Sequence, residues 1–380
     1  MEITLLNAIE LVAGFQAFLF AVYLVLKKDG QKISNYFIAI FIALLAYNIL
    51  DYFASFILNS FSENIKAFLQ MFIYLAAPAL FLHIKFFLFP DTRLRAKNLV
   101  HTIVYLATLM GVVALILSEN EDGVIPEETE FKYSLMYYAV LYIQMYTYLF
   151  LSYRLLKKHK EIFFENYSNT NTKRYTYLKR LIFLVAGLFL LSFVNILTRF
   201  ALQLENFRFI SYVVISAVLF LFCWLIFNGL KSPELFVDKK NVQPPVKDLV
   251  KEKSKISKLE TDEESREMLE NVNRIMVEKE PFLDASLSLH TLASETEIPA
   301  RELSILINHH LNKHFFDFVN EFRIEKAKEL LTSPDKKEFT VLEILYEVGF
   351  NSKSSFNTAF KKHTGLTPTN YRKKHSLSAA

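Results

Sequence analysis

The chain has 380 residues, a formal net charge of +4 and a mean hydropathy of +0.23, and 52% of its residues are hydrophobic. Such an apolar composition excludes an ordinary soluble protein, and the length allows about two or three domains. The single cysteine, Cys223, excludes an intrachain disulfide and lies in an apolar run, as expected for a small side chain buried in the membrane.

Seven apolar segments precede residue 231, and each is long enough to cross a bilayer, which needs ~20 mostly apolar residues. Their predicted limits are Thr4–Leu26, Ser34–Leu58, Ile65–Phe89, Asn98–Leu117, Tyr133–Leu156, Leu178–Leu202 and Phe207–Leu230. The fifth segment is the weakest, because its many tyrosines make it amphipathic, and we expect it to face neighbouring helices more than lipid. These segments predict an all-α, seven-helix transmembrane domain over residues 1–230.

The charges of the loops orient this domain. Basic residues gather after the first, third and fifth segments, whereas the alternate loops contain only Lys66, Lys132 and Arg208. The positive-inside rule therefore predicts an external N-terminus and a cytoplasmic C-terminus, in agreement with an odd number of spans. The acidic loop Ser118–Lys132 is then external. The start Met1-Glu2-Ile3 has no basic region, so we expect a multi-pass protein of the cytoplasmic membrane without a cleavable signal peptide.

Charged residues also occur within the predicted spans, at Glu10, Asp51 and Arg199. Charges inside a membrane usually face the interior of the bundle, where they pair or bind a ligand. One interpretation is a signal site open to the outside, in which Arg199 meets an anion or balances Asp51. The alternative is a structural ion pair, or residues close enough to the interface to be hydrated.

The sequence gives no support for transport or catalysis. It has no inverted repeat with broken helices, and no zinc-protease, nucleophile-elbow or phosphate-loop motif. His309, His310 and His314 lie close together, but no cysteine or acidic residue accompanies them at a ligand spacing. We therefore expect no enzyme activity, no metal and no cofactor.

The composition changes at Lys231. Residues 231–262 are rich in lysine, and Gln243-Pro244-Pro245 prevents a continuous helix, so we expect a flexible cytoplasmic linker attracted to anionic lipid or, alternatively, to DNA. A juxtadomain helix is predicted over residues 263–280. Its apolar stripe consists of Met268, Leu269, Val272, Ile275 and Met276. This stripe either packs on the following domain or pairs with the same helix of a second copy, which would make a homodimer.

Residues 281–375 contain two predicted helix–turn–helix units. In the first, Ser288 is placed to cap a helix, and a turn near Pro299 leads to a second helix. In the second unit, Gly349 ends one helix because glycine adopts positive φ without steric cost, and Gly365 ends the next. The residues expected to face the interior of the second unit are Val341, Ile344, Leu345, Val348, Phe356 and Phe360. A long helix with a continuous apolar face, from Phe315 to Leu331, joins the two units.

Three motifs in this region carry a family resemblance. They are Leu289-x-x-Leu292-Ala293, Arg323-Ile324-x-x-Ala327-x-x-Leu330-Leu331 and Gly349-Phe350-x-x-x-x-x-Phe356-x-x-x-Phe360-Lys361-x-x-x-Gly365-x-x-Pro368-x-x-Tyr371-Arg372. On these residues, the C-terminal region resembles the DNA-binding domain of the AraC/XylS family of bacterial transcription regulators, and the seven spans resemble its membrane-attached members. The resemblance implies two helix–turn–helix units, bridged by one helix, that read adjacent major grooves of double-stranded DNA.

The resemblance also implies which residues contact DNA. Those expected to face bases are Arg301, Ser304, Lys353, Ser354, Ser355 and Thr358, with Asn308 as a weaker candidate. Lys361, Lys362 and Arg372 are expected to bind phosphates and so to set position rather than sequence specificity. No acidic residue follows Glu347, which favours an electrostatic footprint for phosphate. For each single residue, the alternative is a solvated helix face.

The region departs from the family pattern at four positions. Pro299 stands where a serine N-cap is usual, and Ile305 replaces a position that is often polar or basic. Asn312 stands where glycine is frequent, although asparagine also tolerates left-handed geometry. Leu345 occupies a place usually held by alanine, so we expect a wider crossing of the two helices there.

Three functional hypotheses follow from this organisation. In the first, the chain is a one-component receptor, and a small-molecule or protein signal acting outside or within the bilayer alters DNA binding through the long helix or through dimerisation. In the second, the bundle only anchors a constitutive regulator or docks a separate sensor. The third, a transporter with a regulatory tail, is the least supported.

Overall fold

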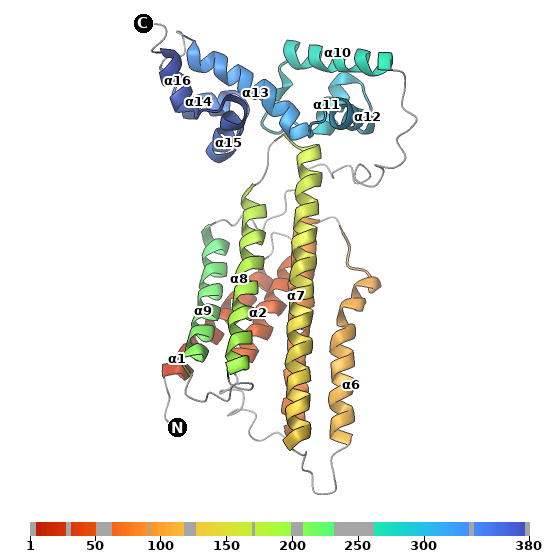
Figure 1. The fold of residues 1–380 in the computed structure, drawn as a ribbon, viewed down its shortest axis with the longest axis vertical. Helices are drawn as coiled ribbons and strands as arrows, with labels where there is room; N and C mark the ends of the chain where they lie inside the picture. Colours follow the sequence, from red (N-terminus) through yellow and green to blue (C-terminus); the bar gives the residue numbers. More distant parts are fainter. Residues whose placement is uncertain are drawn as a thin grey trace. The chain divides into compact units, whose positions relative to one another are not determined.

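The computed structural model is helical throughout the part of the chain that it describes. That part comprises residues 5–27, 32–50, 63–89, 92–117, 127–168, 172–198, 208–231, 262–333 and 338–376. Within these ranges no residue belongs to a β-strand, and the one β-type feature is an isolated antiparallel bridge between Tyr167 and Ser288. The chain forms two compact units, Met1–Lys157 with Lys173–Lys240, and Lys158–Thr172 with Asn241–Ala380. The all-α class is therefore confirmed for the described residues (Figure 1).

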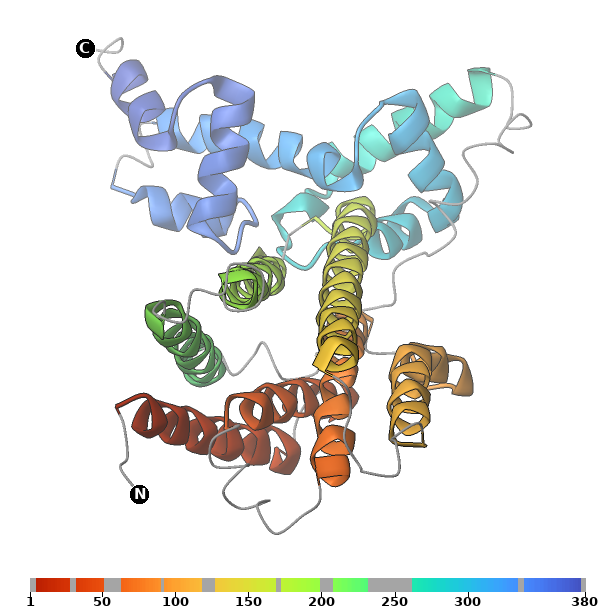
Figure 2. The ribbon, with the colours of Figure 1, turned by 60° about the horizontal axis from the view of Figure 1, so that its bottom comes forward.

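The first unit is a group of apolar helices. They are α1 (Leu5–Leu26), α2 (Lys32–Ile49), α4 (Glu63–Gln70), η2 (Met71–Leu75), α5 (Ala76–Leu88), η3 (Ala96–Thr102), α6 (Ile103–Leu117), the greater part of α7 (Glu127–Asn166), α8 (Thr172–Ile196) and α9 (Arg208–Lys231). Helix α2 packs on both α1 and α5, and α1 also packs on α9 (Figure 2). The small side chains of Ala13 and Ala17 on α1 are fully buried, which allows close approach of neighbouring helices.

Five helical segments in this unit are long and apolar enough to cross a membrane. They are Ala8–Leu26, Phe68–Leu88, Ala96–Ala114, Arg174–Ile196 and Phe209–Gly229, and Lys32–Asn48 is apolar but shorter. Helix α7 is not among the five, although it has 40 residues. The structure therefore supports five of the seven predicted spans by length and composition, and the second and fifth remain predictions.

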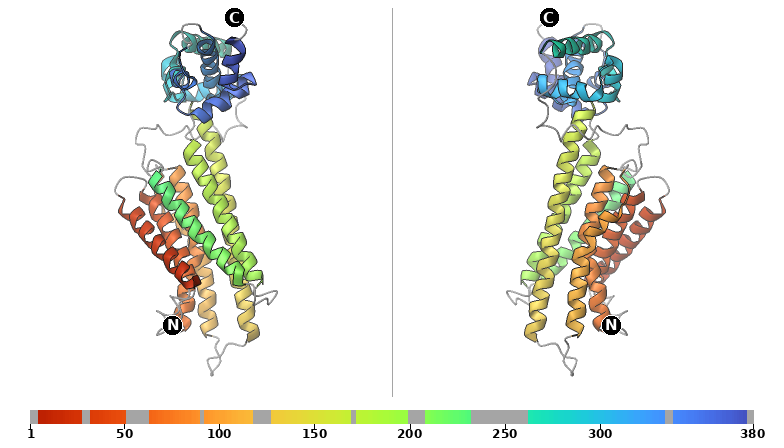
Figure 3. Two further views of the ribbon diagram at one scale, coloured as in Figure 1. Left: turned by 90° about the vertical axis from the view of Figure 1, so that its left-hand side faces the viewer. Right: turned by 90° about the vertical axis from the view of Figure 1, so that its right-hand side faces the viewer.

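Helix α7 contacts its neighbours through its polar side chains, as the tyrosines of this segment led us to expect. The Tyr142 hydroxyl lies 2.9 Å from the hydroxyl of Ser192 on α8, and the Tyr146 hydroxyl donates to the carbonyl oxygen of Ala186. Helices α7 and α8 run side by side in the views of Figures 1 and 3. Among the predicted intramembrane charges, Glu10 is buried on α1, whereas Asp51 and Arg199 lie outside the described residues.

The second unit contains the predicted helix–turn–helix pair. Its helices are α10 (Asp262–Glu278), η7 (Pro281–Leu283), α11 (Leu289–Thr296), α12 (Ala300–Ile305), the π-helix η8 (Leu306–His310), α13 (Phe315–Thr332), α14 (Val341–Glu347), α15 (Lys353–Thr364) and α16 (Pro368–Ser376). Helix α13 contributes Phe315 and Phe318 to a first core with α10–α12, and Ile324 and Ala327 to a second core with α14 and α15. One helix therefore joins the two helix–turn–helix units and fixes their spacing, as predicted (Figure 1).

The ends of these helices lie where the sequence places them. The Ser288 and Ser352 hydroxyls accept from backbone N–H groups in the first turns of α11 and α15. Gly349 and Gly365 have φ of 84° and 73°, which confirms that both glycines end a helix in the left-handed region. Asn312 also has a positive φ, of 51°, as its left-handed tolerance predicted.

Helix α10 decides between the two interpretations of its apolar stripe. Val272 and Met276 are fully buried in the first core, and the Asn271 side chain donates to the Thr296 carbonyl oxygen at 3.1 Å. The stripe therefore packs on the helix–turn–helix unit that follows it. The preceding linker, residues 232–261, lies outside the described residues.

Candidate nucleic-acid interface

Helix α15 has one buried face and one basic face. Phe356, Ala359 and Phe360 are buried in the second core. The opposite face exposes Lys353, Ser354, Thr358, Lys361 and Lys362. This separation follows from helical spacing, because residues three and four apart share a face. The exposed face combines positive charge with hydroxyl groups, and both bind the phosphates and base edges of a nucleic acid.

Two of the predicted contact residues in the second helix–turn–helix unit are turned inward. Ser355 is half-buried, and its hydroxyl oxygen is inaccessible to solvent, so it does not belong to the exposed face. Arg372 is also half-buried, and its Nη1 donates to the Phe339 carbonyl oxygen at 2.7 Å. This bond connects α16 to the segment before α14. The Ser355 hydroxyl is therefore not presented on the exposed face, and the contact of Arg372 with phosphate stays a prediction.

Lys361 and Lys362 differ in their surroundings although they are adjacent. The Lys362 ammonium lies 2.7 Å from a carboxylate oxygen of Asp317, on α13. Part of its charge is thereby balanced within the protein. Lys361 is exposed beside it. The two lysines are therefore not equivalent as phosphate ligands.

The first helix–turn–helix unit exposes fewer polar side chains than the sequence suggested. Arg301 is exposed in the first turn of α12, whereas Ser304 is 1% exposed and accepts a hydrogen bond from the Asn308 side chain at 3.1 Å. Ser304 is adjacent to Leu303 and precedes Leu306, both buried, so helical spacing places it on the inner face. Its predicted contact with bases is corrected, and Asn308 is half-buried and engaged with it.

The outward row of α12 and η8 contains residues that the sequence argument passed over. Counting by fours from Arg301 gives Ile305, which is half-buried, and then His309, which is exposed. Pro299 precedes α12 as its N-cap and supplies no side-chain hydrogen bond, in agreement with the predicted departure. The helical period alone would have favoured His309 over Ser304 as a surface residue.

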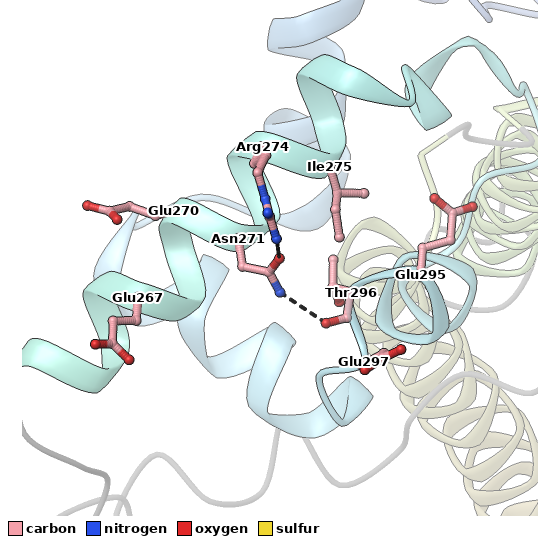
Figure 4. A pocket seen from close by; sticks show the side chains of 8 residues that line it. All are labelled: Glu267, Glu270, Asn271, Arg274, Ile275, Glu295, Thr296 and Glu297. Atoms are coloured by element: carbon pink, nitrogen blue, oxygen red, sulfur yellow. Dashed lines mark hydrogen bonds between the residues drawn. The ribbon is translucent and has the colours of Figure 1, made fainter.

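A groove between α10 and α11 has the opposite electrostatic character. Its lining residues are Glu267, Glu270, Asn271, Arg274, Ile275, Glu295, Thr296 and Glu297 (Figure 4). Arg274 is the one cation among four carboxylates, and it donates to the Asn271 side chain at 2.9 Å. An acidic groove repels phosphate, so this part of the domain does not favour a nucleic acid.

Comparison with known proteins identifies the kind of domain in this part of the chain. Residues 292–374 match the family described as a helix-turn-helix domain. The second unit carries an AraC-type helix–turn–helix domain. The matched residues include both predicted turns and all of α12–α15.

Similar proteins match stretches of comparable length. An uncharacterized HTH-type transcriptional regulator, YdeC of Bacillus subtilis, is 33% identical over 90 residues, or 24% of this chain and 30% of that protein. The melibiose operon regulatory protein of Escherichia coli K12 is 27% identical over 90 residues, or 24% of this chain and 29% of that protein. Among solved structures, the C-terminal domain of the response regulator AraT from Geobacillus stearothermophilus is 31% identical, with a TM-score of 0.25, over 28% of this chain and 84% of that one. The chain thus spans about a third of the length of these curated relatives.

Proposed function

We propose that this chain is a membrane-embedded transcription regulator that binds double-stranded DNA in a sequence-specific manner through its C-terminal helix–turn–helix domain. The observation that carries the proposal is the pair of helices α12 and α15, joined by α13, whose outer faces expose Arg301 and Lys353. In this geometry each helix enters one major groove, and two adjacent grooves on one face of DNA lie about 10 base pairs apart.

The contacts divide between bases and phosphates. Arg301 is suited to a bidentate pair with guanine, and Lys353, Ser354 and Thr358 face bases from the start of α15. The Thr358 hydroxyl donates to the Ser354 carbonyl oxygen at 2.8 Å, so it approaches a base as an acceptor or through its methyl group. Lys361 and Lys362 bind phosphate further along the helix.

The membrane assignment is supported by large apolar side chains on the outside of the first unit. Four of these side chains are more than 60% exposed: Phe15 (61%), Phe18 (63%), Met110 (72%) and Phe209 (73%). In a bilayer they would contact lipid and not water, so their exposure would carry no cost. We propose seven spans, an external N-terminus and a cytoplasmic helix–turn–helix domain. The buried Glu10, with Asp51 and Arg199, is the proposed intramembrane signal site, and the signal reaches it from outside or from the bilayer.

Genome-wide mapping of bound DNA tests the function. The full-length chain is expected to enrich fragments that share two half-sites about 10 base pairs apart. The double variant Arg301→Ala with Lys353→Ala is expected to lose this enrichment, whereas Arg266→Ala, which removes an exposed positive charge from α10, keeps it. Equal enrichment of the same fragments by the double variant would contradict the proposed reading surface.

Lys361 and Lys362 give a second test, on an enriched fragment. Lys361→Ala is expected to weaken binding uniformly across sequences and to reduce the slope of log K against log salt concentration by about 1, because one phosphate contact is lost. Lys362→Ala is expected to change this slope less, because Asp317 already balances part of its charge at 2.7 Å. Titrations at several salt concentrations measure both slopes, and a larger effect at Lys362 would contradict the assignment.

A reporter gene under an enriched promoter distinguishes a sensor from an anchor. If the bundle is the sensor, Arg199→Ala and Glu10→Gln alter the response to inducing conditions. The alternative, a tether for a constitutive regulator, predicts an unchanged response in both variants.

A further inference from the structure

The segment that follows α7 is bound to the helix–turn–helix domain. Within the second unit, Tyr167 forms the antiparallel bridge with Ser288, the residue that caps α11. The Ser168 N–H and hydroxyl both donate to the Leu287 carbonyl oxygen, at 3.2 and 2.7 Å. Ser168 is completely buried. The two residues after α7, Tyr167 and Ser168, therefore pair with the backbone at the start of the first helix–turn–helix unit, although they are distant from it in sequence.

Arg323 joins this pair of residues to the rest of the domain. Its guanidinium donates to the Ser168 carbonyl oxygen and hydroxyl, both at 3.0 Å, and to the carbonyl oxygens of Phe282 and Asp284 at 2.6 and 2.8 Å. The same group lies 5.5 Å from the centre of the Phe350 ring, in the turn of the second helix–turn–helix unit. One fully buried side chain at the middle of α13 thus connects Ser168 to both helix–turn–helix units.

The end of α7 adds an aromatic contact to the start of α13. The Phe164 and Phe316 rings lie 4.8 Å apart in an edge-to-face arrangement, and Phe164 also lies beside the ring of His314, the residue before α13. His314 precedes α13, and Phe316 lies in its first turn. Helix α13 sets the spacing of the recognition helices. Residues Lys158–Ser168, which we call the α7 end segment, belong to the second unit, although the sequence assigned them to the transmembrane domain.

Helix α7 is unbroken from Glu127 to Asn166, and 40 helical residues extend about 60 Å. Most of the helix belongs to the first unit, and its last turns belong to the second. We infer that the α7 end segment is the regulatory input of the DNA-binding domain, and that its pairing with Leu287, Ser288 and Arg323 holds the two recognition helices ready for DNA. A displacement of α7 in the first unit withdraws this pairing and weakens DNA binding.

This inference rests on the proposed function and changes the route by which the signal travels. The covalent connection from the last span to the domain runs through residues 232–261. The hydrogen bonds of Ser168 give a second connection, between positions 155 residues apart in the chain. Such a connection is sensitive to movement of a rigid helix, because hydrogen bonds weaken steeply as their distance and angle change.

A cysteine cross-link tests the contact in the full-length chain, reconstituted in lipid nanodiscs with Cys223→Ser. Residues opposite each other in an antiparallel bridge have Cα atoms about 4.5–5.5 Å apart, which is within the range of a disulfide. Mild oxidation of Tyr167→Cys with Ser288→Cys is therefore expected to give a disulfide in the peptide map. The control pair, Glu161→Cys with Ser288→Cys, starts from an exposed position on α7 and is expected to stay reduced. Failure of the first pair to cross-link beyond the control would overturn the inference.

DNA affinity on an enriched fragment tests the regulation. Ser168→Trp cannot fit at a completely buried position, so it is expected to displace the segment and raise the Kd at least about fivefold, the lower end of typical allosteric coupling. Ser168→Ala removes only the hydroxyl bonds and is expected to act in the same direction with a smaller effect. Glu161→Trp, on the exposed face of α7, is the matched control and is expected to bind as the wild type does. The oxidised Tyr167→Cys, Ser288→Cys protein is expected to bind at least as tightly as the same protein in its reduced form, because the disulfide keeps the segment in place.

The outcomes separate the inference from the proposed function. Hydrogen exchange of α14 and α15 verifies that the Ser168→Trp domain is folded. A folded variant with the affinity of Glu161→Trp would overturn the regulatory inference while leaving DNA binding intact. A wild-type chain that binds no genomic fragment would overturn the proposed function, and the inference with it.

Discussion

Replacing Gly349 by alanine is expected to destabilise the second helix–turn–helix unit by about 2–5 kcal/mol. The backbone there has a φ of 84°, which side chains with a Cβ adopt only with strain. An added Cβ would also lie 2.5 Å from the Phe282 carbonyl oxygen and 2.7 Å from that of Leu283. Both are backbone atoms next to the bonds of Arg323, so they cannot rotate away. Hydrogen exchange of α14 and α15 peptides in the full-length chain measures the loss.

Gly365 provides the matched control for this experiment. Its φ of 73° is similar, but an added Cβ would meet no atom within 4 Å. Gly365→Ala is therefore expected to cost only the strain of the left-handed conformation, about 1–2 kcal/mol. The difference between the two variants isolates the close approach of the Gly349 turn to η7. Equal losses would mean that this approach contributes nothing to stability.

Local chemistry explains why much of the second unit could be predicted from its sequence. A serine before an apolar run accepts a hydrogen bond from a backbone N–H group in the first turn of the helix. A glycine after such a run adopts the left-handed conformation that ends the helix. Ser288, Gly349 and Gly365 accordingly mark helix ends in the structure. Thr340 adds a complete capping box with Glu343, in which each side chain binds the backbone N–H of the other residue. These signals span three or four residues, so no tertiary information was needed.

The inner faces of α12 and α16 could not be predicted in the same way. Carrying contact residues over by position assumes that each helix keeps its rotation about its own axis. The buried residues Leu303, in α12, and Leu306, at the start of η8, fix that rotation, and it turns Ser304 inward. Arg372 is long enough to reach the Phe339 carbonyl oxygen, which competes with phosphate for the same donors. Charge and residue type alone do not reveal which partner is within reach.

The extent of α7 shows a different limit of sequence reasoning. The predicted span ended at Leu156, where the hydropathy falls, but the helix continues to Asn166. Hydropathy reports the preference of a segment for lipid, whereas lysine, glutamate and histidine are all compatible with a helix in water. The bonds between Ser168 and Arg323 depend on tertiary folding and leave no local pattern. The contact between Ser168 and Arg323 was therefore beyond prediction from sequence.

Arg323→Met is expected to destabilise the second unit by about 3–5 kcal/mol, because methionine fills the volume but leaves buried backbone acceptors unsatisfied at about 1–3 kcal/mol each. Burial lowers the pKa of Arg323 to about 10, against an opposing effect of Asp284, so the group remains charged at neutral pH and requires these acceptors. Arg323→Lys is expected to lose most of the same stability, since one ammonium cannot replace the planar fork of donors that reaches Phe282, Asp284 and Ser168 together.

Hydrogen exchange across the whole second unit tests the role of Arg323 as the connection between its cores. The loss is expected in α11 peptides as well as in α14 and α15 peptides, because the guanidinium contacts Phe282 of the first core and Phe350 of the second. Arg274→Met, at an exposed arginine of α10, is the control and is expected to stay within about 0.5 kcal/mol of the wild type. A loss confined to α13, or no larger than that of Arg274→Met, would mean that the two helix–turn–helix units are spaced by the stiffness of α13 alone. In that case a displacement of the α7 end segment would not affect the second recognition helix.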